Sequence, residues 1–141
     1  MKRTGSAIWS GEIKSGGGTV STESGVLASV PYSFARRFGE KTGTNPDELI
    51  GAAHAGCYSM ALSGVLGSMG MTANEISTSA VVSIDPAGDG FEITSIHLTV
   101  RADIPGADAA KFLEAATAAK EGCPVSKALA SVEITLDAAL A

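Results

Sequence analysis

A long helix with clear start signals begins in the segment Thr44-Asn45-Pro46-Asp47-Glu48-Leu49-Ile50-Gly51-Ala52-Ala53-His54-Ala55-Gly56-Cys57. Asn45 is a favourable N-cap residue and Pro46 suits the first helical position. Glu48 completes an N-x-x-E capping box, so we expect a helix from Pro46 to about Gly67. Along this helix small side chains recur every four positions, which permits close approach of another helix: Ala55, Ser59, Ser63 and Gly67.

The segment from Leu49 to Asn74 carries no formal charge, which raises the question of a membrane span. Its many glycines and serines, together with His54, make it too polar for a helix exposed to lipid. We therefore expect a buried helix in a protein that has no membrane contact.

Strands and shorter helices are expected on both sides of this helix. Before it, strands are predicted at 6–13, 19–22 and 26–30, with an irregular segment at 31–43. After it, we expect strands at 76–84 and 91–104, a helix capped by Asp108 that runs to Glu121, a short helix at 124–129 and a strand at 132–136. In the second of these strands Ile96, Leu98, Val100, Ala102 and Ile104 share one face. This order predicts a single α+β domain over residues 1–141, with antiparallel sheets packed around long central helices.

Composition restricts the possible functions. Hydrophobic residues make up 45% of the chain and charged residues 18%, which is typical of a folded domain. The net charge of −5 and the scattering of the ten basic residues argue against nucleic-acid binding. The amino terminus has no apolar segment of the kind found in secretory signals, so we expect a cytoplasmic protein, in which a purely structural disulfide is not expected.

The two cysteines lie far apart in the chain, each in a distinctive position. Cys123 directly precedes Pro124 at the N-cap of a new helix, where backbone N–H groups favour a thiolate. Cys57 lies in the middle of the long helix, so a cation would have to lower its pKa, and Arg36 or Arg37 is available. Composition alone leaves open that both are small buried hydrophobic residues. No C-x-x-C or paired-histidine spacing is present, so we expect no metal site.

Four segments resemble the OsmC/Ohr family (osmotically inducible protein C and organic hydroperoxide resistance proteins), and together they cover essentially the whole chain. They are Thr44 to Cys57, Gly122-Cys123-Pro124-Val125-Ser126-Lys127, Gly18 to Gly25, and Ile134-Thr135-Leu136. His54 before the first cysteine, with the Val20 to Gly25 segment, is more similar to the OsmC branch than to the Ohr branch.

The resemblance implies an intertwined homodimer with two active sites at the subunit interface. It implies thiol-dependent reduction of organic hydroperoxides to alcohols, in oxidative or osmotic stress defence, without haem, flavin or metal. Cys57 matches the peroxidatic cysteine, which becomes a sulfenic acid, and Cys123 matches the resolving cysteine, which forms the disulfide. The reducing equivalents would come from thiols, such as the dihydrolipoyl groups of a partner protein. A redox sensor and a non-catalytic dimeric protein remain as alternatives.

Further site residues follow from the same resemblance. Arg37 matches the arginine of the Y-x-F-x-x-R-F pattern, seen here as Tyr32 to Phe38. Asp47 occupies an acidic position that is usually glutamate, and its shorter side chain leaves Glu48 as an alternative partner for the arginine. His54 shares a helix face with Cys57 and could tune the thiol, relay a proton or simply pack.

One expectation comes from distance along the long helix. Asp47 and Cys57 are roughly 15 Å apart on a straight helix. We therefore expect the acid–arginine pair that serves one Cys57 to come partly from the other subunit.

Overall fold

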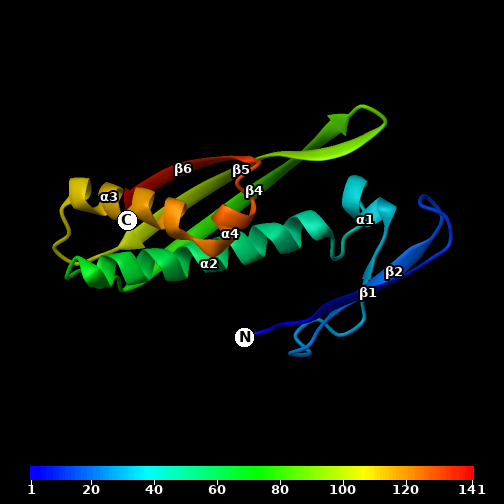
Figure 1. Cartoon of the computed structure of the whole chain (residues 1–141), viewed down its shortest axis with the longest axis horizontal. Helices are drawn as coiled ribbons and strands as arrows, with labels where there is room; N and C mark the ends of the chain where they lie inside the picture. Colours follow the sequence, from blue (N-terminus) through cyan, green and yellow to red (C-terminus); the bar gives the residue numbers. More distant parts are fainter. The chain divides into compact units, whose positions relative to one another are not determined.

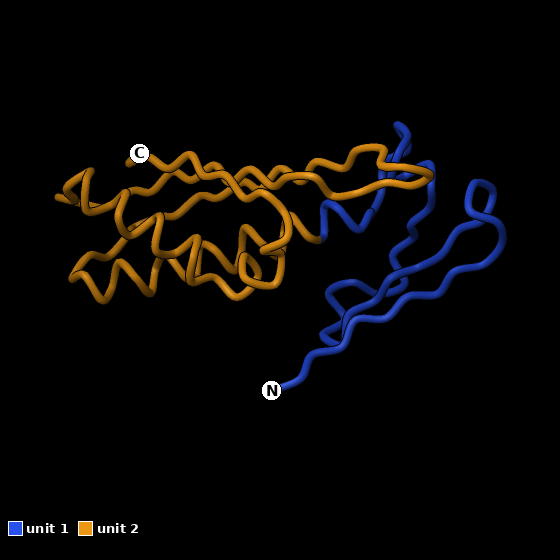
Figure 2. The backbone as a smooth tube through the Cα atoms, turned by 45° about the horizontal axis from the view of Figure 1, so that its top comes forward, with its two compact units in different colours: residues 1–49 blue, residues 50–141 orange.

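Helix α2 (Pro46–Ser68) spans the boundary between the two compact units of the computed structural model, which describes residues 1–141 (Figures 1 and 2). Unit 1 is Met1–Leu49 and unit 2 is Ile50–Ala141. The element order is β-β-β-α-α-β-β-α-α-β. The chain is thus α+β, as predicted.

Unit 1 contains a three-stranded antiparallel sheet in the order β1-β2-β3. Its strands are β1 (Gly5–Ser10), β2 (Gly17–Thr22) and β3 (Val30–Tyr32). The turn between β1 and β2 needs glycine, because Gly11 has φ of 87° and a Cβ on Gly16 would lie 2.4 Å from the Ser10 carbonyl oxygen.

The third strand was predicted at 26–30, and this placement is wrong. Side chains at the end of β2 hydrogen-bond to the following loop: Leu27 N–H donates to Thr22 Oγ1 and Ser29 N–H to Ser21 Oγ. Positive φ angles at Gly25 and Ser29 bend the same loop. Such side-chain contacts compete with a strand ladder, so pairing with β2 begins only at Val30.

A short helix, α1 (Phe34–Phe38), lies within the segment that was predicted to be irregular. Ser33 caps it by accepting a hydrogen bond from Arg36 N–H. The rings of Phe34 and Phe38 stack at the i, i+4 spacing with their centroids 4.8 Å apart. This helix is too short to show hydrophobic periodicity, which is why the sequence pattern did not reveal it.

Both ends of α2 follow the predicted signals. Asn45 Oδ1 accepts a hydrogen bond from Glu48 N–H at 2.9 Å. At the other end, Gly70 adopts φ of 74°, Gly70 N–H donates to the Gly67 carbonyl and Met71 N–H to the Leu66 carbonyl. This is a Schellman cap, in which glycine supplies the left-handed conformation that ends the helix.

Unit 2 contains a sheet in the order β4-β5-β6, formed by β4 (Glu75–Ala87), β5 (Gly90–Asp103) and β6 (Glu133–Leu140). The hairpin β4–β5 is antiparallel as predicted, but β6 runs parallel to β5. The helices α3 (Ala109–Gly122) and α4 (Pro124–Ala128) lie between β5 and β6 in the chain. Such a crossover carries the chain back to the end of the sheet where β5 began, which allows parallel pairing.

Helices α2 and α3 cover one face of this sheet (Figure 1). The predicted face of β5 is buried, and it packs with Tyr58, Leu62 and Leu66 of α2 and with Phe112 of α3. Three alanines of α3 complete the core: Ala115, Ala116 and Ala119. The face of the sheet that carries His97, Arg101 and Asp137 is polar and exposed.

Helix α2 is long and apolar enough, by length and composition alone, to cross a membrane, a test that core helices of soluble proteins also pass. One side of it is fully buried in unit 2, where His54, Tyr58, Leu62 and Leu66 recur every four residues. The other side is exposed and is called the open face of α2 below: Ala52, Ala53, Gly56, Met60, Ser63, Gly64 and Gly67.

Candidate active site

The fold brings the two cysteines of the chain together. Cys57 Sγ and Cys123 Sγ lie 2.9 Å apart in their reduced form, although 66 positions separate them in the sequence. Cys123 is fully buried and Cys57 is partly exposed. A disulfide needs the sulfurs about 2.05 Å apart, so a small movement suffices to join them.

Cys123 occupies the break between α3 and α4. Its backbone is extended, with φ of −60° and ψ of 123°, and its N–H donates to the Ala119 carbonyl at the end of α3. Pro124 then begins α4, since proline has no N–H to donate and suits the first helical position. The side chain makes no cap hydrogen bond of its own, and its sulfur contacts Cys57 of α2 instead.

The surroundings of the two sulfurs shift their pKa values in opposite directions. Burial raises the pKa of the Cys57 thiol, and its contact with Cys123 raises it further, against a weaker opposing effect of Val125 N–H. Burial also raises the pKa of Cys123, but this is outweighed by Cys57, by the N–H and hydroxyl of Ser126 and by Val125 N–H, so the net direction is down. Between these two thiols, therefore, the negative charge is more stable on Cys123.

None of the influences on the pKa of Cys57 comes from a cation. An attacking thiolate at Cys57 therefore requires a positive charge in addition to these groups, as the position of Cys57 in mid-helix predicts.

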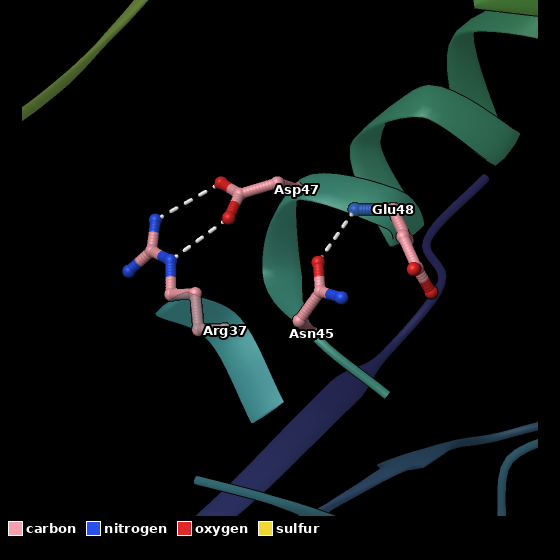
Figure 3. Close-up of polar contacts among 4 residues, drawn as sticks. All are labelled: Arg37, Asn45, Asp47 and Glu48. Carbon is pink, nitrogen blue, oxygen red and sulfur yellow. Dashed lines mark hydrogen bonds and ion pairs between the residues drawn. The ribbon is translucent and has the colours of Figure 1, made fainter. Parts of the chain in front are cut away.

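Arg37 and Asp47 form a bidentate ion pair within unit 1 (Figure 3). Arg37 Nε donates to Asp47 Oδ2 at 2.9 Å, and Nη2 donates to Oδ1 at 3.0 Å. The guanidinium also lies 5.2 Å from the centre of the Phe38 ring. The shorter aspartate side chain thus reaches the arginine at the position where the family pattern usually has glutamate.

Glu48 does not take part in this pair. Its backbone N–H is held by the Asn45 side chain, and its exposed carboxylate points away from Arg37 (Figure 3). Arg36, the other candidate cation, forms no ion pair, and its buried Nε has no hydrogen-bond partner. Asp47 therefore orients one specific arginine, Arg37.

An apolar pocket of about 280 Å³ lies beside Arg37 in unit 1. Most of its walls are aromatic or aliphatic, and the full lining is Trp9, Ile13, Tyr32, Ser33, Phe34, Arg37, Phe38 and Pro46. A charged guanidinium at the edge of an apolar pocket suits a ligand that has an apolar group next to a polar one.

His54 does not contact a cysteine directly. It is fully buried, its Nε2 lies 2.8 Å from Ser126 Oγ, and its Nδ1 has no partner. Burial lowers the pKa of His54, so the ring is neutral near pH 7. Ser126 was missed as a site residue, although its position three residues after the N-cap Cys123 could have revealed it, because N-cap and N3 side chains lie next to each other.

Tyr58 is a second residue that sequence reasoning missed. Its hydroxyl donates to the Ala116 carbonyl at 3.0 Å. Burial, followed by the negative charge of Cys123, raises the pKa of Tyr58 to about 12. Its position directly after Cys57 in the sequence could have revealed it as a residue of the site.

Comparison with known proteins agrees with this geometry. The sequence profile of the family described as OsmC-like protein matches residues 39–137. The chain is 54% identical over 137 residues to Peroxiredoxin OsmC of Escherichia coli (strain K12), an alignment that covers 97% of this chain and 95% of that protein. It is 29% identical over 137 residues to the organic hydroperoxide resistance protein OhrB of Bacillus subtilis (strain 168), covering 93% of this chain and 98% of that one.

The crystal structure of the Bacillus subtilis OhrB protein has a similar fold, with a TM-score of 0.76 and 27% identity over 96% of this chain and 98% of that chain. The greater identity to OsmC than to OhrB agrees with the predicted branch. On these grounds the chain belongs to the OsmC-like protein family, in its OsmC branch.

Proposed function

We propose that this chain is a thiol-dependent peroxidase that reduces organic hydroperoxides to alcohols, with Cys57 as the peroxidatic and Cys123 as the resolving cysteine. The observation that carries the proposal is the 2.9 Å separation of the two sulfurs, which come from distant parts of the sequence. Relatives that align with nearly the whole chain are named as a peroxiredoxin and as an organic hydroperoxide resistance protein.

The bonds that form and break belong to the two cysteines, the hydroperoxide and the dithiol reductant. The Cys57 thiolate attacks the distal oxygen of ROOH, the O–O bond breaks, and the leaving alkoxide takes a proton to give ROH and a Cys57 sulfenic acid. The Cys123 thiolate then attacks the Cys57 sulfur, the S–O bond breaks, and the leaving hydroxide takes a proton to give water and a disulfide. A dithiol reductant returns both cysteines to the thiol form by exchange.

Arg37 is the proposed cation for the first step. Two of its nitrogens are engaged by Asp47, which leaves Nη1 to face a thiolate or a peroxide oxygen. A positive charge there would lower the pKa of Cys57 and stabilise the charge that develops on the breaking O–O bond. The apolar pocket beside Arg37 would hold the organic group of the hydroperoxide.

We propose further that the working form is a homodimer in which residues 1–141 act as one domain. The open face of α2 supports this, since it exposes small and apolar side chains, including Met60 at 79% exposure. A second copy covering this face would also explain why the helix is apolar without spanning a membrane. The Arg37–Asp47 pair serving one Cys57 would then come from the partner subunit.

The proposed reductant is a dithiol such as a dihydrolipoyl group, and the proposed compartment is the cytoplasm. A dithiol suits the proposed Cys57–Cys123 disulfide, because its second thiol resolves the mixed disulfide formed by the first. A reducing compartment suits a disulfide that has to be reduced again after each turnover.

Two measurements test this function. Intact mass after one equivalent of cumene hydroperoxide should fall by about 2 Da in the wild type, whereas Cys123→Ser should gain about 16 Da as a sulfenic acid on Cys57. Steady consumption of cumene hydroperoxide with reduced lipoamide should show many turnovers per chain and none in Cys57→Ser. A disulfide that forms once without turnover would instead indicate a redox sensor.

A further inference from the structure

A buried chain of polar side chains joins α2 to the resolving cysteine. His54 Nε2 lies 2.8 Å from Ser126 Oγ, and Ser126 stands one helical turn after Cys123. His54 and Cys123 are fully buried, and Ser126 is 6% exposed. Ser126 stabilises negative charge on the Cys123 sulfur, which lies 2.9 Å from Cys57 Sγ.

We propose that His54 and Ser126 are positioning residues for the resolving step, acting in series as hydrogen-bond donors that hold Cys123 as a thiolate directed at Cys57. This proposal rests on the proposed peroxidase function and assigns these two residues to its second half-reaction. The sequence left open whether His54 tunes the Cys57 thiol, relays a proton or packs, and the proposal instead assigns it to Cys123.

The backbone places the Ser126 hydroxyl beside the Cys123 sulfur. Cys123 is the N-cap of α4 and Ser126 is at position N3, and in a capping box the N3 side chain reaches back to the N-cap residue. The Ser126 hydroxyl and N–H both stabilise negative charge on the Cys123 sulfur. The Cys123 side chain does not cap α4, and the hydroxyl of Ser126 in the first turn of α4 is the donor available to its sulfur.

The hydrogen positions follow from counting donors. Ser126 has one hydroxyl proton, and if it points to the sulfur, its oxygen must accept from His54. We therefore assign the proton of the neutral ring to Nε2, so that Nε2–H donates to Ser126 Oγ. Nδ1 is then a buried acceptor without a partner, which is better tolerated than a buried N–H without one.

Of the groups around Cys123, Cys57 has the largest stabilising influence on negative charge at the Cys123 sulfur, and the N–H and hydroxyl of Ser126 follow it. From α2, Cys57 Sγ shares a hydrogen bond with Cys123 Sγ. Tyr58 keeps its own proton, since its hydroxyl donates to the Ala116 carbonyl. From α3, the ammonium group of Lys120 lies 3.4 Å from the Ile134 carbonyl oxygen. From α4, Val125 contributes only its backbone N–H, and the side chain of Lys127 is exposed. Ser126, whose oxygen lies 2.8 Å from His54 Nε2, is the side-chain hydroxyl that stabilises negative charge on the Cys123 sulfur.

A purely structural histidine would be costly at this position. His54 belongs to the buried side of α2, where the other members are Tyr58, Leu62 and Leu66. An imidazole with one unpartnered nitrogen is less favourable there than an apolar side chain of similar size. A role in positioning Ser126 accounts for its presence.

The resolving step is balanced in atoms and in charge. The Cys123 thiolate attacks the sulfur of the Cys57 sulfenic acid, the S–S bond forms and the S–O bond breaks. The departing hydroxide takes a proton from solvent to give water. When the dithiol later reduces the disulfide and regenerates the Cys123 thiolate, a proton returns to solvent. His54 and Ser126 keep their own protons throughout and only stabilise the thiolate before attack.

The test separates the two half-reactions in a single turnover. Reduced protein is mixed with one equivalent of cumene hydroperoxide, quenched with acid at intervals, and analysed by mass spectrometry for Cys57 sulfenic acid and for disulfide. Removing the hydroxyl in Ser126→Ala should raise the pKa of Cys123, because a donor to the thiolate is lost. A smaller fraction of Cys123 is then thiolate at pH 7, although each thiolate is more nucleophilic because its pKa is higher. Disulfide formation should therefore slow about threefold at pH 7.

The pH profile distinguishes this role from a structural one. At about pH 10 the thiolate forms without help, so Ser126→Ala should match or exceed the wild type. Ser126→Thr should restore the rate at pH 7. His54→Leu should be slowed at pH 7 in the same way, whereas His54→Gln, whose amide N–H can replace Nε2–H, should keep at least about half of the rate. The rate of Cys57 oxidation should not fall in any of the four variants, because a Cys123 that keeps its proton places less negative charge beside the Cys57 sulfur.

Ser59→Ala is the matched control, because it removes a hydroxyl of α2 that bonds to Ala55 and Thr78 and not to a cysteine. The proposal is overturned if Ser126→Ala resolves at the wild-type rate at pH 7, or if its slowing is the same at all pH values. Equal slowing by His54→Gln and His54→Leu would overturn the donor role of His54. Failure of the proposed function would appear separately, as wild-type Cys57 that hydroperoxide does not oxidise.

Discussion

Arg37 and Asp47 are joined by two parallel hydrogen bonds of 2.9 and 3.0 Å, one from Nε and one from Nη2 of the guanidinium. The arginine lies in the last turn of α1 and the aspartate in the first turn of α2. The end of α1 and the start of α2 thus fix the plane of the guanidinium. The side chain of Asp47 is only 10% exposed. Asp47 can hold the plane because α1 brings the arginine close to the start of α2.

The first prediction concerns this pair. Arg37→Lys should lower kcat/KM for cumene hydroperoxide by roughly tenfold to a hundredfold, because an ammonium group cannot make the planar two-point contact. Asp47→Asn should lower it by about tenfold, whereas Asp47→Glu should stay within about threefold, since it keeps a bidentate carboxylate. Steady-state kinetics with a lipoyl dithiol measures all three.

Arg101→Lys provides the control for the first prediction. Arg101 pairs with Asp137 at 2.9 Å on the exposed face of the β4-β5-β6 sheet, away from both cysteines. Its replacement should leave kcat/KM unchanged. Equal damage from Asp47→Glu and Asp47→Asn would show that the carboxylate does not act by orienting Arg37.

The second prediction concerns the origin of the arginine at each site. If Arg37 of one subunit serves Cys57 of the other, mixed dimers of Cys57→Ser and Arg37→Ala chains contain one site with both residues intact. Such mixtures should recover part of the activity, up to about half per mixed dimer by this count. Activity is measured after co-expression with two different tags and purification of the doubly tagged dimer. Verified mixed dimers without activity would place the complete site within one chain.

Much of the fold could be predicted from local signals. The cap at Asn45, the glycine stop at Gly70 and the cap at Asp108 are determined by residues within one or two turns of each boundary. The buried face of β5 followed from strict alternation of apolar residues. These features needed no knowledge of the distant parts of the chain.

Other features depend on contacts that local patterns do not encode. The parallel pairing of β6 follows from the path through α3 and α4, and the late start of β3 follows from hydroxyl contacts such as Thr22 to Leu27. The link between His54 and Ser126 crosses 72 positions in the sequence. Sequence reasoning singled out both cysteines and Arg37 as candidates, but it left the partner of His54 open, because that contact depends on the fold.

The third prediction concerns the apolar pocket beside Arg37. Ile13 lines it and is 66% exposed, so Ile13→Ser should not disturb folding. Losing about 50 Å² of apolar contact with the organic group weakens binding by about 1.3 kcal/mol, or roughly tenfold in kcat/KM for cumene hydroperoxide. Because hydrogen peroxide has no organic group, its kcat/KM should change by less than about twofold. The measured quantity is the ratio of the two constants.

Val26→Ser is the control for the pocket prediction, since Val26 is 83% exposed and does not line the pocket. The ratio should stay at the wild-type value in this variant. A similar loss for both peroxides in Ile13→Ser would mean that the pocket positions Arg37 and does not bind the organic group.

The fourth prediction concerns the pH dependence of stability at Tyr58. Its pKa is raised to about 12 by burial and by the charge of Cys123, above an unfolded value of about 10. The folded state therefore holds the proton more tightly, and this contribution is complete below about pH 10 and is lost as the pH rises towards about 12. By about pH 11 the free energy of unfolding should have fallen by about 1.4 kcal/mol through this group alone.

Tyr58→Phe cannot ionise, so the difference in unfolding free energy between this variant and the wild type should depend on pH. At about pH 8 the variant should be about 1 kcal/mol less stable, because the Ala116 carbonyl loses its donor. At about pH 11 the difference should vanish or reverse, since only the wild type then loses stability through Tyr58. Urea unfolding at one fixed protein concentration measures both values, because dimer stability depends on concentration. A difference that stays constant from pH 8 to pH 11 would mean that Tyr58 ionises as easily in the folded chain as in the unfolded one.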